Sequence, residues 1–314
     1  MKLGFFTACL PQLPLQQLAE WAAAHDFDAL EIAAWPRSDS RQFEASHIDV
    51  ASLTTREAEK IRADLDARRI HISSLAYYDN NLHPDLAVRE QIHAHLRRCI
   101  DAAQMLGCGL VGTFIGRDPS LSVCDNLKLA ETQLPPLVEY ARIRDVRLMV
   151  ENCPMLGWHP DGYPGNLGYS REFWEWMFRL GFYLNYDPSH LAWLAIDPVA
   201  AITSQPDRIA HVQAKDVEIN QAARDEIGIF GRAINRTDPW DNGWYRYRVP
   251  GLGSIDWRRI IDTLYQVGFD GVVSVEHEDP VWAGTEHRLL DGLLIAHSTL
   301  RPLVRHLSDG TNMS

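Results

Sequence analysis

Short apolar runs alternate with amphipathic stretches along most of the chain. The apolar runs predict β-strands at residues 3–7, 29–33, 70–76, 110–115, 146–151, 182–186, 209–214 and 272–276. Between these runs, apolar residues recur at the spacing of one helical face, as at Ile92, Leu96 and Ile100. The pattern therefore predicts a strand followed by a helix, repeated along the chain.

Residues at the ends of these segments indicate where helices begin and stop. Thr54 and Glu57 have the spacing of a capping box at a helix start. Gly107 follows a long amphipathic segment and is the residue type at which helices usually stop. The pair Pro135 and Pro136 predicts a break or a kink after the fourth strand, because proline cannot donate to the hydrogen bonds of a helix.

Strands that alternate with helices, without a Gly- or Ser-rich linker, predict a (β/α)8 TIM barrel. We expect a single domain over residues 1–314, because barrels of this kind reach that length. The alternative is a doubly wound sheet, which needs a glycine-rich phosphate turn after its first strand. Residues 7–11 read Thr-Ala-Cys-Leu-Pro and contain no glycine, so the barrel is favoured.

The longest stretch without a clear period covers residues 217–256 and follows the seventh predicted strand. It contains Trp240, Trp244, Tyr245 and Tyr247. Long loops in compact domains are usually functional or disordered, and this aromatic content favours a folded segment. We therefore expect a lid at the carboxyl-terminal face of the barrel.

Composition and charge narrow the class of protein. Hydrophobic residues make up 46% of the chain and charged residues 23%, which is the balance of a soluble globular protein. The net charge of -12 disfavours nucleic acid and anionic membranes as partners, because binding either one begins with Lys and Arg at phosphates. Five scattered cysteines without a Cys-x-x-Cys pair fit a reduced, cytoplasmic protein, and we find no targeting or membrane-spanning segment.

Candidate chemistry gathers where four consecutive predicted strands end, which is where the active sites of barrels lie. The residues that close these strands are Glu151-Asn152, Asp187-Pro188-Ser189-His190, His211-Val212-Gln213-Ala214-Lys215-Asp216 and Glu276-His277-Glu278-Asp279. Successive side chains of a strand alternate between its two faces. We therefore expect His211, Gln213 and Lys215 to point together toward the barrel axis.

The same alternation brings the carboxylates of Glu151, Asp187 and Glu276 together from separate strands. Partly desolvated carboxylates repel one another, and a bound divalent cation is the usual way to keep such a group ionised. The sequence therefore predicts a metal site. Oxygen-rich ligation with at most one nitrogen favours Mn2+, Mg2+ or Co2+ over a thiolate zinc site.

These strand ends resemble the motifs of the sugar phosphate isomerase/epimerase family. Its members are xylose isomerase-like barrels, among them ketose 3-epimerases, inosose dehydratases and endonuclease IV. The resemblance extends from Leu3 through the last predicted helix. It implies that Glu151, Asp187 and Glu276 are metal ligands, that Glu151 and Glu276 form the acid/base pair, and that His190 contacts substrate. We expect Mn2+ as the metal, with Mg2+, Co2+ or Zn2+ as alternatives.

The seventh strand departs from the pattern of the family. The family commonly has His-x-His there, with the second histidine on the metal, whereas this chain has His211 and then Gln213. Either the amide oxygen of Gln213 binds the metal, or His211 replaces it, or the affinity for metal is reduced. An amide oxygen is a weaker ligand than imidazole for transition metals, so the departure favours hard ions or weak binding.

The resemblance implies chemistry on a small carbohydrate. A cation beside a carbonyl and two glutamates that move protons would support isomerisation or epimerisation through an enediolate. The same site would be a lyase or dehydratase if the enolate expelled a β-hydroxyl or a glycosidic oxygen. A third hypothesis is a non-catalytic barrel subunit, motivated only by Gln213. DNA repair is a distant fourth, because the extra histidines of a trinuclear site are not evident in strands two and three. Members of this group often associate, so a homo-oligomer is a further expectation.

Each single residue also has an ordinary structural explanation. A strand-end carboxylate such as Glu151 is more often a solvated turn residue, so the metal prediction depends on the whole set. His190 and His211 are expected to contact substrate, but a helix cap and a core histidine are equally good explanations.

The remaining candidates lie near the ends of the seventh and eighth strands and in the predicted lid. Lys215 and Arg248 are expected to bind substrate, with a surface ion pair and an exposed loop as the ordinary alternatives. Around them we expect a rim formed by His277, Glu278 and Asp279.

Overall fold

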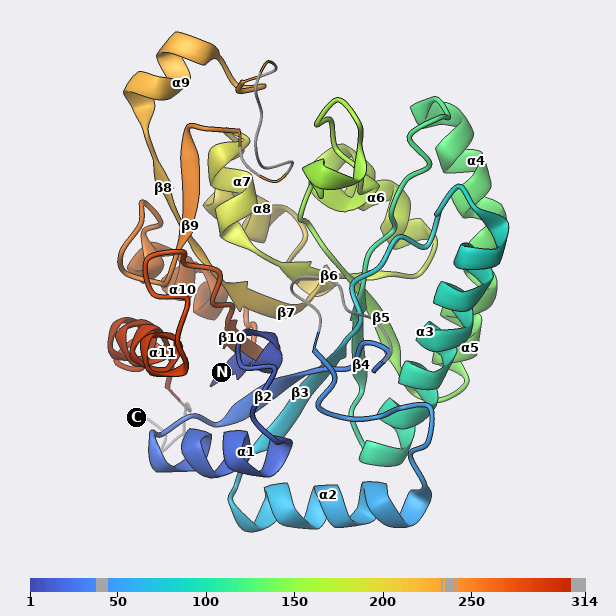
Figure 1. The fold of residues 1–314 in the computed structure, drawn as a ribbon, viewed down its shortest axis with the longest axis vertical. Helices are drawn as coiled ribbons and strands as arrows, with labels where there is room; N and C mark the ends of the chain where they lie inside the picture. Colours follow the sequence, from blue (N-terminus) through green and yellow to red (C-terminus); the bar gives the residue numbers. More distant parts are fainter. Residues whose placement is uncertain (38–44, 233, 235–239, 241, 306–314) are drawn as a thin grey trace, which may run out of the picture.

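The structure is a computed structural model, which describes residues 1–37, 45–232, 234, 240 and 242–305. Parallel strands close into a barrel in the order β1, β10, β7, β6, β5, β4, β3, β2 (Figure 1). The barrel strands are β1 Lys2–Phe6, β2 Ala29–Ala33, β3 His71–Ala76, β4 Leu110–Thr113, β5 Arg147–Glu151, β6 Tyr183–Tyr186, β7 Ile209–Ala214 and β10 Val272–Val275. A separate antiparallel pair consists of β8 Asp216–Ile219 and β9 Tyr245–Arg248.

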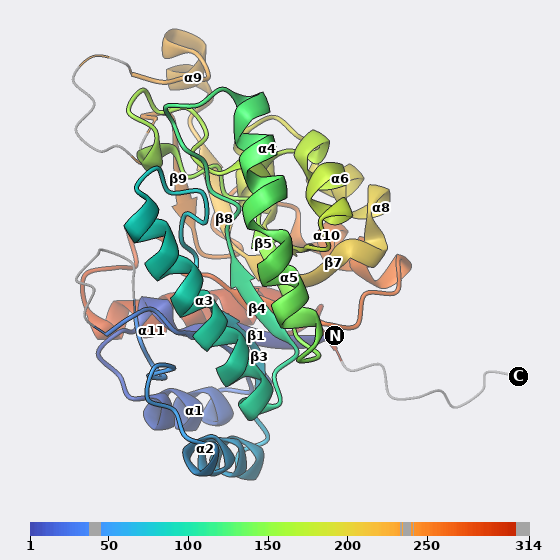
Figure 2. The same cartoon turned by 90° about the vertical axis from the view of Figure 1, so that its right-hand side faces the viewer.

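Most of the helices surround the barrel on its outside, and one lies beyond one end of it (Figures 1 and 2). They are α1 Leu15–Ala24, α2 Thr55–Ala67, α3 Leu86–Leu106, α4 Val123–Gln133, α5 Pro135–Arg142, α6 Arg171–Arg179, α7 Pro188–Trp193, α8 Pro198–Ser204, α9 Gln221–Ile227, α10 Trp257–Gln266 and α11 Glu286–Leu300. Short 3-10 turns occur at Thr7–Cys9, Leu156–Trp158, Leu167–Tyr169 and Pro206–Arg208. Within the described part of the chain, no helix combines the length and the apolar character needed to cross a bilayer.

The predicted barrel is confirmed, and each predicted strand is one of its strands. The bounds of β2 and β7 match the prediction, and those of the other barrel strands differ from it by one or two residues. The first strand stops at Phe6, for example, because Thr7 already begins a 3-10 turn. Apolar patterning thus locates a buried strand but not the residue at which the backbone leaves the sheet.

The predicted helix boundaries are also confirmed. The backbone N–H of Glu57 donates to Thr54 Oγ1 over 3.3 Å, and the backbone N–H of Thr54 donates to Glu57 Oε2 over 2.9 Å. Gly107 ends α3 in the left-handed conformation, with φ of 67°. The break at the two prolines separates α4, which ends at Gln133, from α5, which begins at Pro135.

Hydrogen bonds between strands that are not neighbours identify the side chains inside the barrel. His211 Nε2 on β7 lies 3.1 Å from Ser73 Oγ on β3, and Gln213 Nε2 donates to Glu31 Oε1 on β2 over 3.1 Å. Both contacts cross the barrel, so His211 and Gln213 point inward, as the alternation along the strand predicts. Fully buried polar side chains fill this part of the interior, namely Glu31, Ser74, Asn185, His211, Gln213 and Ser274.

The predicted irregular segment after β7 is partly regular. Strands β8 and β9 form a hairpin that includes α9, which we call the β8–β9 hairpin. Trp193 of α7 stacks on Tyr245 of β9, with ring centroids 4.6 Å apart and ring planes 10° apart. Residues 233, 235–239 and 241 of the predicted lid lie outside the described residues. The aromatic side chains thus join the hairpin to α7, which begins at the end of β6.

Asp216, at the start of β8, fixes the loop that leads from the hairpin to α10. Its side chain is fully buried. Oδ1 accepts hydrogen bonds from the N–H groups of Val217 (2.8 Å) and Ile255 (3.0 Å). Oδ2 accepts from the N–H of Gly251 (3.0 Å) and from Nε1–H of Trp257 (3.0 Å). A single carboxylate therefore accepts hydrogen bonds from the start of the hairpin, from the loop that follows it and from the start of α10.

We expect Asp216→Asn to destabilise the protein. The amide replaces one acceptor oxygen by an NH2 group that must face N–H donors in either orientation. The expected loss in the free energy of unfolding is about 2–4 kcal/mol, because buried hydrogen bonds to a charged group contribute about 1.5–3 kcal/mol each. Urea unfolding followed by circular dichroism measures this loss.

Asp256→Asn is the matched control, since it is the same substitution in the same loop. Asp256 is exposed at the N-cap of α10 and accepts a hydrogen bond from the Arg259 N–H over 3.1 Å. Asn caps a helix as well as Asp does, so its effect should stay within about 0.5 kcal/mol. Equal stability of the two variants would contradict the anchoring role of Asp216.

Candidate active site

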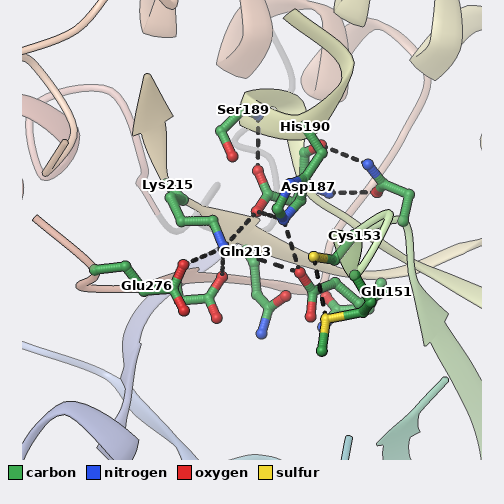
Figure 3. A network of polar contacts seen from close by, with 12 residues as sticks. Glu151, Cys153, Asp187, Ser189, His190, Gln213, Lys215 and Glu276 are labelled. Atoms are coloured by element: carbon green, nitrogen blue, oxygen red, sulfur yellow. Dashed lines mark hydrogen bonds and ion pairs between the residues drawn. The ribbon is translucent and has the colours of Figure 1, made fainter. Parts of the chain in front are cut away.

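Three carboxylates meet at the carboxyl-terminal end of the barrel. Glu151 is the last residue of β5, Asp187 follows β6 and Glu276 follows β10. An oxygen atom from each lies within 4.8 Å of those from the other two, and all three residues are buried. The convergence predicted from the strand ends is therefore present in the fold (Figure 3).

The side chain of Asn152, which follows the neighbouring strand β5, holds the backbone of Asp187 in place. Asn152 Nδ2–H donates to the carbonyl oxygen of Asp187, and the Asp187 N–H donates to Asn152 Oδ1, both over 2.8 Å. Asp187 is also the N-cap of α7, because its Oδ1 accepts from the Ser189 N–H over 2.7 Å. The ends of β5 and β6 are thus locked together, which leaves Asp187 Oδ2 directed at the cluster.

Lys215 is the cation among these carboxylates. Its Nζ lies 2.7 Å from Glu276 Oε2, 2.9 Å from Glu278 Oε2, 3.3 Å from Asp187 Oδ2 and 3.9 Å from Glu151 Oε1 (Figure 3). The side chain is only 2% exposed, so the alternative of an ordinary surface pair does not apply. Lys215 points inward, as the alternation along β7 predicts.

The carboxylates outnumber this cation. Four negative charges would face one ammonium if all four carboxyl groups were ionised. Burial raises the pKa of Glu151 to about 7 and the pKa of Glu276 well above its ordinary value, in both cases against the pull of Lys215. The pKa of Asp187 is raised too, mainly by burial. Burial alone would lower the pKa of Lys215, but the surrounding carboxylates raise it well above its usual range.

His190 joins two members of the cluster. Its Nε2 lies 3.1 Å from Glu151 Oε1 and 3.2 Å from Asp187 Oδ2, while Nδ1 lies 2.9 Å from Tyr247 Oη. Burial lowers the pKa of His190 to about 3, so the ring is neutral and carries one proton. A proton on Nε2 satisfies all three contacts, because the ring then donates to the carboxylates and accepts from the Tyr247 hydroxyl.

The donor set fits a divalent metal ion. Gln213 Oε1 is buried and has no hydrogen-bond partner among the described residues, and the buried oxygens Asp187 Oδ2 and Glu276 Oε2 share the single ammonium of Lys215. Lys215 by itself leaves an excess of negative charge, which a divalent cation would offset. Carboxylate and amide oxygens are hard ligands of the kind that Mg2+ and Mn2+ take. Glu151, Asp187, Glu276 and Gln213 are therefore the residues that could hold such an ion.

A second group of ligand-type atoms shares Glu151 with this set. Glu151, Cys153 and His190 also bring one atom each within 4.8 Å of one another. Burial and the charge of Glu151 raise the pKa of the Cys153 thiol well above its ordinary value, and a protonated thiol is a poor ligand. The three carboxylates are the better candidate. All five cysteines are free thiols, as the sequence predicts.

Gln213 lies on β7, between the strand that precedes Asp187 and the strand that precedes Glu276. Its Nε2 donates to Glu31 Oε1 over 3.1 Å and lies 3.4 Å from Tyr78 Oη. Its Oε1 has no hydrogen-bond partner among the described residues. Of the two ligands that the sequence offers on this strand, the amide oxygen of Gln213 is the one that is available.

His211 lies outside the carboxylate cluster, deeper in the barrel. Both ring nitrogens have partners, since Nδ1 lies 2.9 Å from Asn185 Oδ1 and Nε2 lies 3.1 Å from Ser73 Oγ. Burial lowers the pKa of His211 to about 3, so the ring is neutral. These contacts match the core-histidine explanation, and a substrate contact for His211 stays a prediction.

Arg248 also lies apart from the cluster, on the β8–β9 hairpin. Its Nε–H donates to Asp279 Oδ2 over 2.8 Å, and its Nη1 forms an ion pair with Glu218. Asp279, expected at the rim, is fully buried and also accepts from the Val249 N–H over 3.1 Å. This pair fastens the hairpin to the segment after β10, and a substrate contact for Arg248 stays a prediction.

Glu31 and Tyr78 are polar residues of this region that the pattern of strand ends missed. Burial raises the pKa of Glu31 to about 7, against hydrogen bonds from Tyr78, Ser274 and Gln213. A charged residue inside the otherwise apolar strand Ala29–Ala33 was a signal that could have identified Glu31. Tyr78 carried no comparable signal, because an aromatic residue after a strand is ordinary core material.

Known proteins resemble this chain over most of its length. The family model described as xylose isomerase-like TIM barrel matches residues 19–294. YfiH of Bacillus subtilis (strain 168), an uncharacterized protein, is 25% identical over 303 residues, which cover 89% of this chain and 93% of YfiH. Inosose dehydratase of Lacticaseibacillus casei is 32% identical over 104 residues, which cover 32% of this chain and 32% of that enzyme.

Solved structures share the barrel. D-psicose 3-epimerase from Clostridium cellulolyticum H10 superposes with a TM-score of 0.67 at 16% identity, covering 96% of this chain and 99% of that one. The IolI protein with a bound zinc atom superposes with a TM-score of 0.68 at 18% identity, covering 96% and 98%. At these identities the likeness concerns the fold. Because the family model also matches most of the sequence, the chain belongs to the xylose isomerase-like TIM barrel family.

Proposed function

We propose that this protein is a divalent-metal-dependent sugar or keto-sugar isomerase or epimerase, in which Glu151 and Glu276 transfer the proton. The observation that carries the proposal is the buried convergence of Glu151, Asp187 and Glu276 at the strand ends. The membership in a xylose isomerase-like family and the fold shared with D-psicose 3-epimerase support a small carbohydrate as substrate.

The metal site would consist of Glu151, Asp187, Glu276 and the amide oxygen of Gln213. We propose Mn2+ as the ion, with Mg2+, Co2+ or Zn2+ as alternatives. A bound divalent ion supplies positive charge beside a substrate carbonyl, where negative charge develops when a neighbouring proton is removed. IolI, which has the same fold, binds zinc.

Glu151 and Glu276 are suited to accept and return a proton. Burial raises the pKa of Glu151 to about 7 and that of Glu276 well above its ordinary value, and a raised pKa helps a carboxyl group act as a general acid or base. In the proposed reaction one carboxylate removes the proton from the carbon beside the carbonyl, and the C–H electron pair forms an enediolate. The other glutamic acid returns a proton to the opposite face of that carbon in an epimerase. In an isomerase it returns a proton to the neighbouring carbon, and the proton of the adjacent hydroxyl moves to the former carbonyl oxygen.

Lys215 and His190 would orient the reacting groups. The ammonium of Lys215 lies beside both Glu276 and Asp187, so it can donate a hydrogen bond to a substrate oxygen that becomes negative. Nε2–H of His190 donates to Glu151 and holds that carboxylate in position. The ring of Tyr247 lies 4.7 Å from Lys215 Nζ, so the β8–β9 hairpin would shield this part of the site from water.

A metal-dependent dehydratase or lyase on a keto-sugar, keto-glycoside or inosose is the second candidate. The 32% sequence identity with inosose dehydratase over 104 residues favours this candidate. The first step is the same proton removal by a glutamate. The enolate electrons then form a C=C bond, the C–O bond at the β-carbon breaks, and the leaving hydroxyl takes a proton from the second glutamic acid and departs as water.

We expect the Mn2+-loaded protein to incorporate solvent deuterium into a ketose or keto-glycoside, or to release water from it. Glu151→Gln and Glu276→Gln should each lower that rate by about 10²–10⁴-fold, because general acid or base catalysis contributes that factor. Mass spectrometry of a substrate panel in D2O separates the candidates. An isomerase gains deuterium without loss of mass, whereas a dehydratase loses the mass of water.

Glu139→Gln is the control for the loss of a carboxylate outside the site. Glu139 is exposed on α5, where it forms an ion pair with Arg142. The reaction rate of the Glu139→Gln variant should therefore equal that of the wild type. If the metal-loaded wild type neither exchanges deuterium nor releases water with any member of a broad panel, the non-catalytic hypothesis replaces both candidates.

Removal of divalent ions should lower the melting temperature, and Mn2+ should restore it. At a concentration 100 times the dissociation constant the ion would add about 2.7 kcal/mol to the stability of the folded state. Asp187→Asn should abolish this gain, since an amide binds a cation more weakly. Asn also keeps the N-cap of α7, so the helix itself should stay intact.

Thermal unfolding with and without Mn2+ measures this effect, and elemental analysis gives the amount of bound metal. Glu139→Gln should keep the full Mn2+ response. The metal site is wrong if the wild type binds no stoichiometric divalent ion, or if Asp187→Asn responds to Mn2+ as the wild type does.

A further inference from the structure

The Gln213 amide is held at its nitrogen end by two acceptors. Nε2 donates to Glu31 Oε1 over 3.1 Å and lies 3.4 Å from Tyr78 Oη. The Tyr78 hydroxyl donates its own proton to the same Glu31 oxygen over 2.7 Å, and it accepts from Asn185 Nδ2–H over 2.6 Å. Glu31, Asn185 and Gln213 are all fully buried, so bulk solvent does not reach these contacts.

This network determines which way the amide faces. In the reverse orientation Gln213 Oε1 would face an oxygen of Glu31 and the hydroxyl oxygen of Tyr78, whose proton is already donated. Two acceptors facing a third inside a barrel are unfavourable, because buried polar groups need a donor. The nitrogen therefore faces Glu31, and the oxygen has no hydrogen-bond donor in the described part of the chain.

The free oxygen lies on the strand between the two that lead to Asp187 and Glu276. In the view of Figure 3 the Gln213 side chain lies between the carboxylates of Glu276 and Glu151. Glu31 itself is on β2, across the barrel from β7. It lies at the opposite end of the Gln213 amide from the unpartnered oxygen.

We propose that Glu31 is a positioning residue which, by fixing the amide nitrogen of Gln213, presents the amide oxygen as the fourth ligand of the metal site. This inference rests on the proposed function, because it assumes that the three carboxylates hold a divalent ion. Ligands of a metal are commonly oriented by a second hydrogen bond of this kind, and loss of that bond lowers metal affinity.

An all-oxygen ligand set has a consequence for the choice of ion. Glu151, Asp187, Glu276 and the Gln213 amide offer oxygen only, which suits Mn2+ and Mg2+ better than metals that prefer nitrogen. The Glu31–Gln213 pair would thus adapt the site to a hard ion. The family commonly has a histidine at the position of Gln213.

The test is a Mn2+ titration by isothermal calorimetry on the full-length protein. Glu31→Leu, which removes the acceptor, should weaken Mn2+ binding by about 10–100-fold, the usual effect of removing a group that orients a ligand. Gln213→Ala should weaken it as well, because it removes the ligand. If Glu31 acts through Gln213, the double variant should bind Mn2+ no more weakly than Gln213→Ala alone.

Asp118→Asn is the control for loss of a buried carboxylate. Asp118 is buried in the loop after β4, where it accepts from Ser120, and it should leave Mn2+ affinity unchanged. Circular dichroism of every variant identifies any that fail to fold. Tyr78→Phe provides a second route to the same network, since it removes one hydrogen bond to Glu31 and keeps the ring.

The outcomes separate this inference from the proposed function. If the wild type binds Mn2+ and folded Glu31→Leu binds it equally well, Glu31 does not position a ligand, while the metal enzyme survives. The same conclusion follows if Glu31→Leu weakens binding further in the Gln213→Ala background. If the wild type binds no Mn2+, both the inference and the proposed function are wrong.

Gln213→His gives an independent prediction about ion preference. The imidazole would replace an oxygen ligand by nitrogen, so the ratio of Co2+ to Mn2+ affinity should rise relative to the wild type. Competition between the two ions, measured by calorimetry, provides the ratio. An unchanged ratio would contradict a direct contact between residue 213 and the metal.

Discussion

Repulsion among buried carboxylates around Lys215 is the interaction on which the rest of the site depends. One ammonium faces Glu151, Asp187, Glu276 and Glu278 in a space from which solvent is largely excluded. Such a group is stable only if the surrounding structure holds each member in place and the excess charge is offset. The closed barrel provides the first condition, because it brings the ends of β5, β6, β7 and β10 together without relying on mobile loops.

The supporting contacts follow from the same requirement. Asn152 fixes the backbone of Asp187, so that this carboxylate cannot withdraw from its neighbours. Asp216 and Asp279 use further buried carboxylates to fasten the β8–β9 hairpin beside Lys215. The hairpin in turn places Tyr247 against His190, which keeps the neutral imidazole directed at the cluster. Structural and proposed catalytic carboxylates thus occupy the same end of the barrel with different partners.

Most of the fold could be predicted from the sequence, because strand burial and helix periodicity leave a local signal at each element. The three carboxylates could be located too, since each ends a strand. Alternation within a strand gives the direction of a side chain but not its depth along the barrel. Alternation therefore predicts the same inward direction for His211 as for Gln213 and Lys215, although the hydrogen-bond partners of His211 lie deeper in the barrel. The contacts of Gln213 with Glu31 and of Arg248 with Asp279 join residues far apart in sequence, so no local pattern could reveal them.

The proposed metal site needs a divalent ion that is bound by oxygen atoms alone. The most direct measurement is anomalous X-ray diffraction from crystals of the full-length protein grown with Mn2+. We expect one strong peak about 2.1 Å from oxygen atoms of Glu151, Asp187, Glu276 and Gln213, as for a small hard divalent ion. A map without a peak at this position, in which the Lys215 ammonium still lies among the carboxylates, would contradict the account.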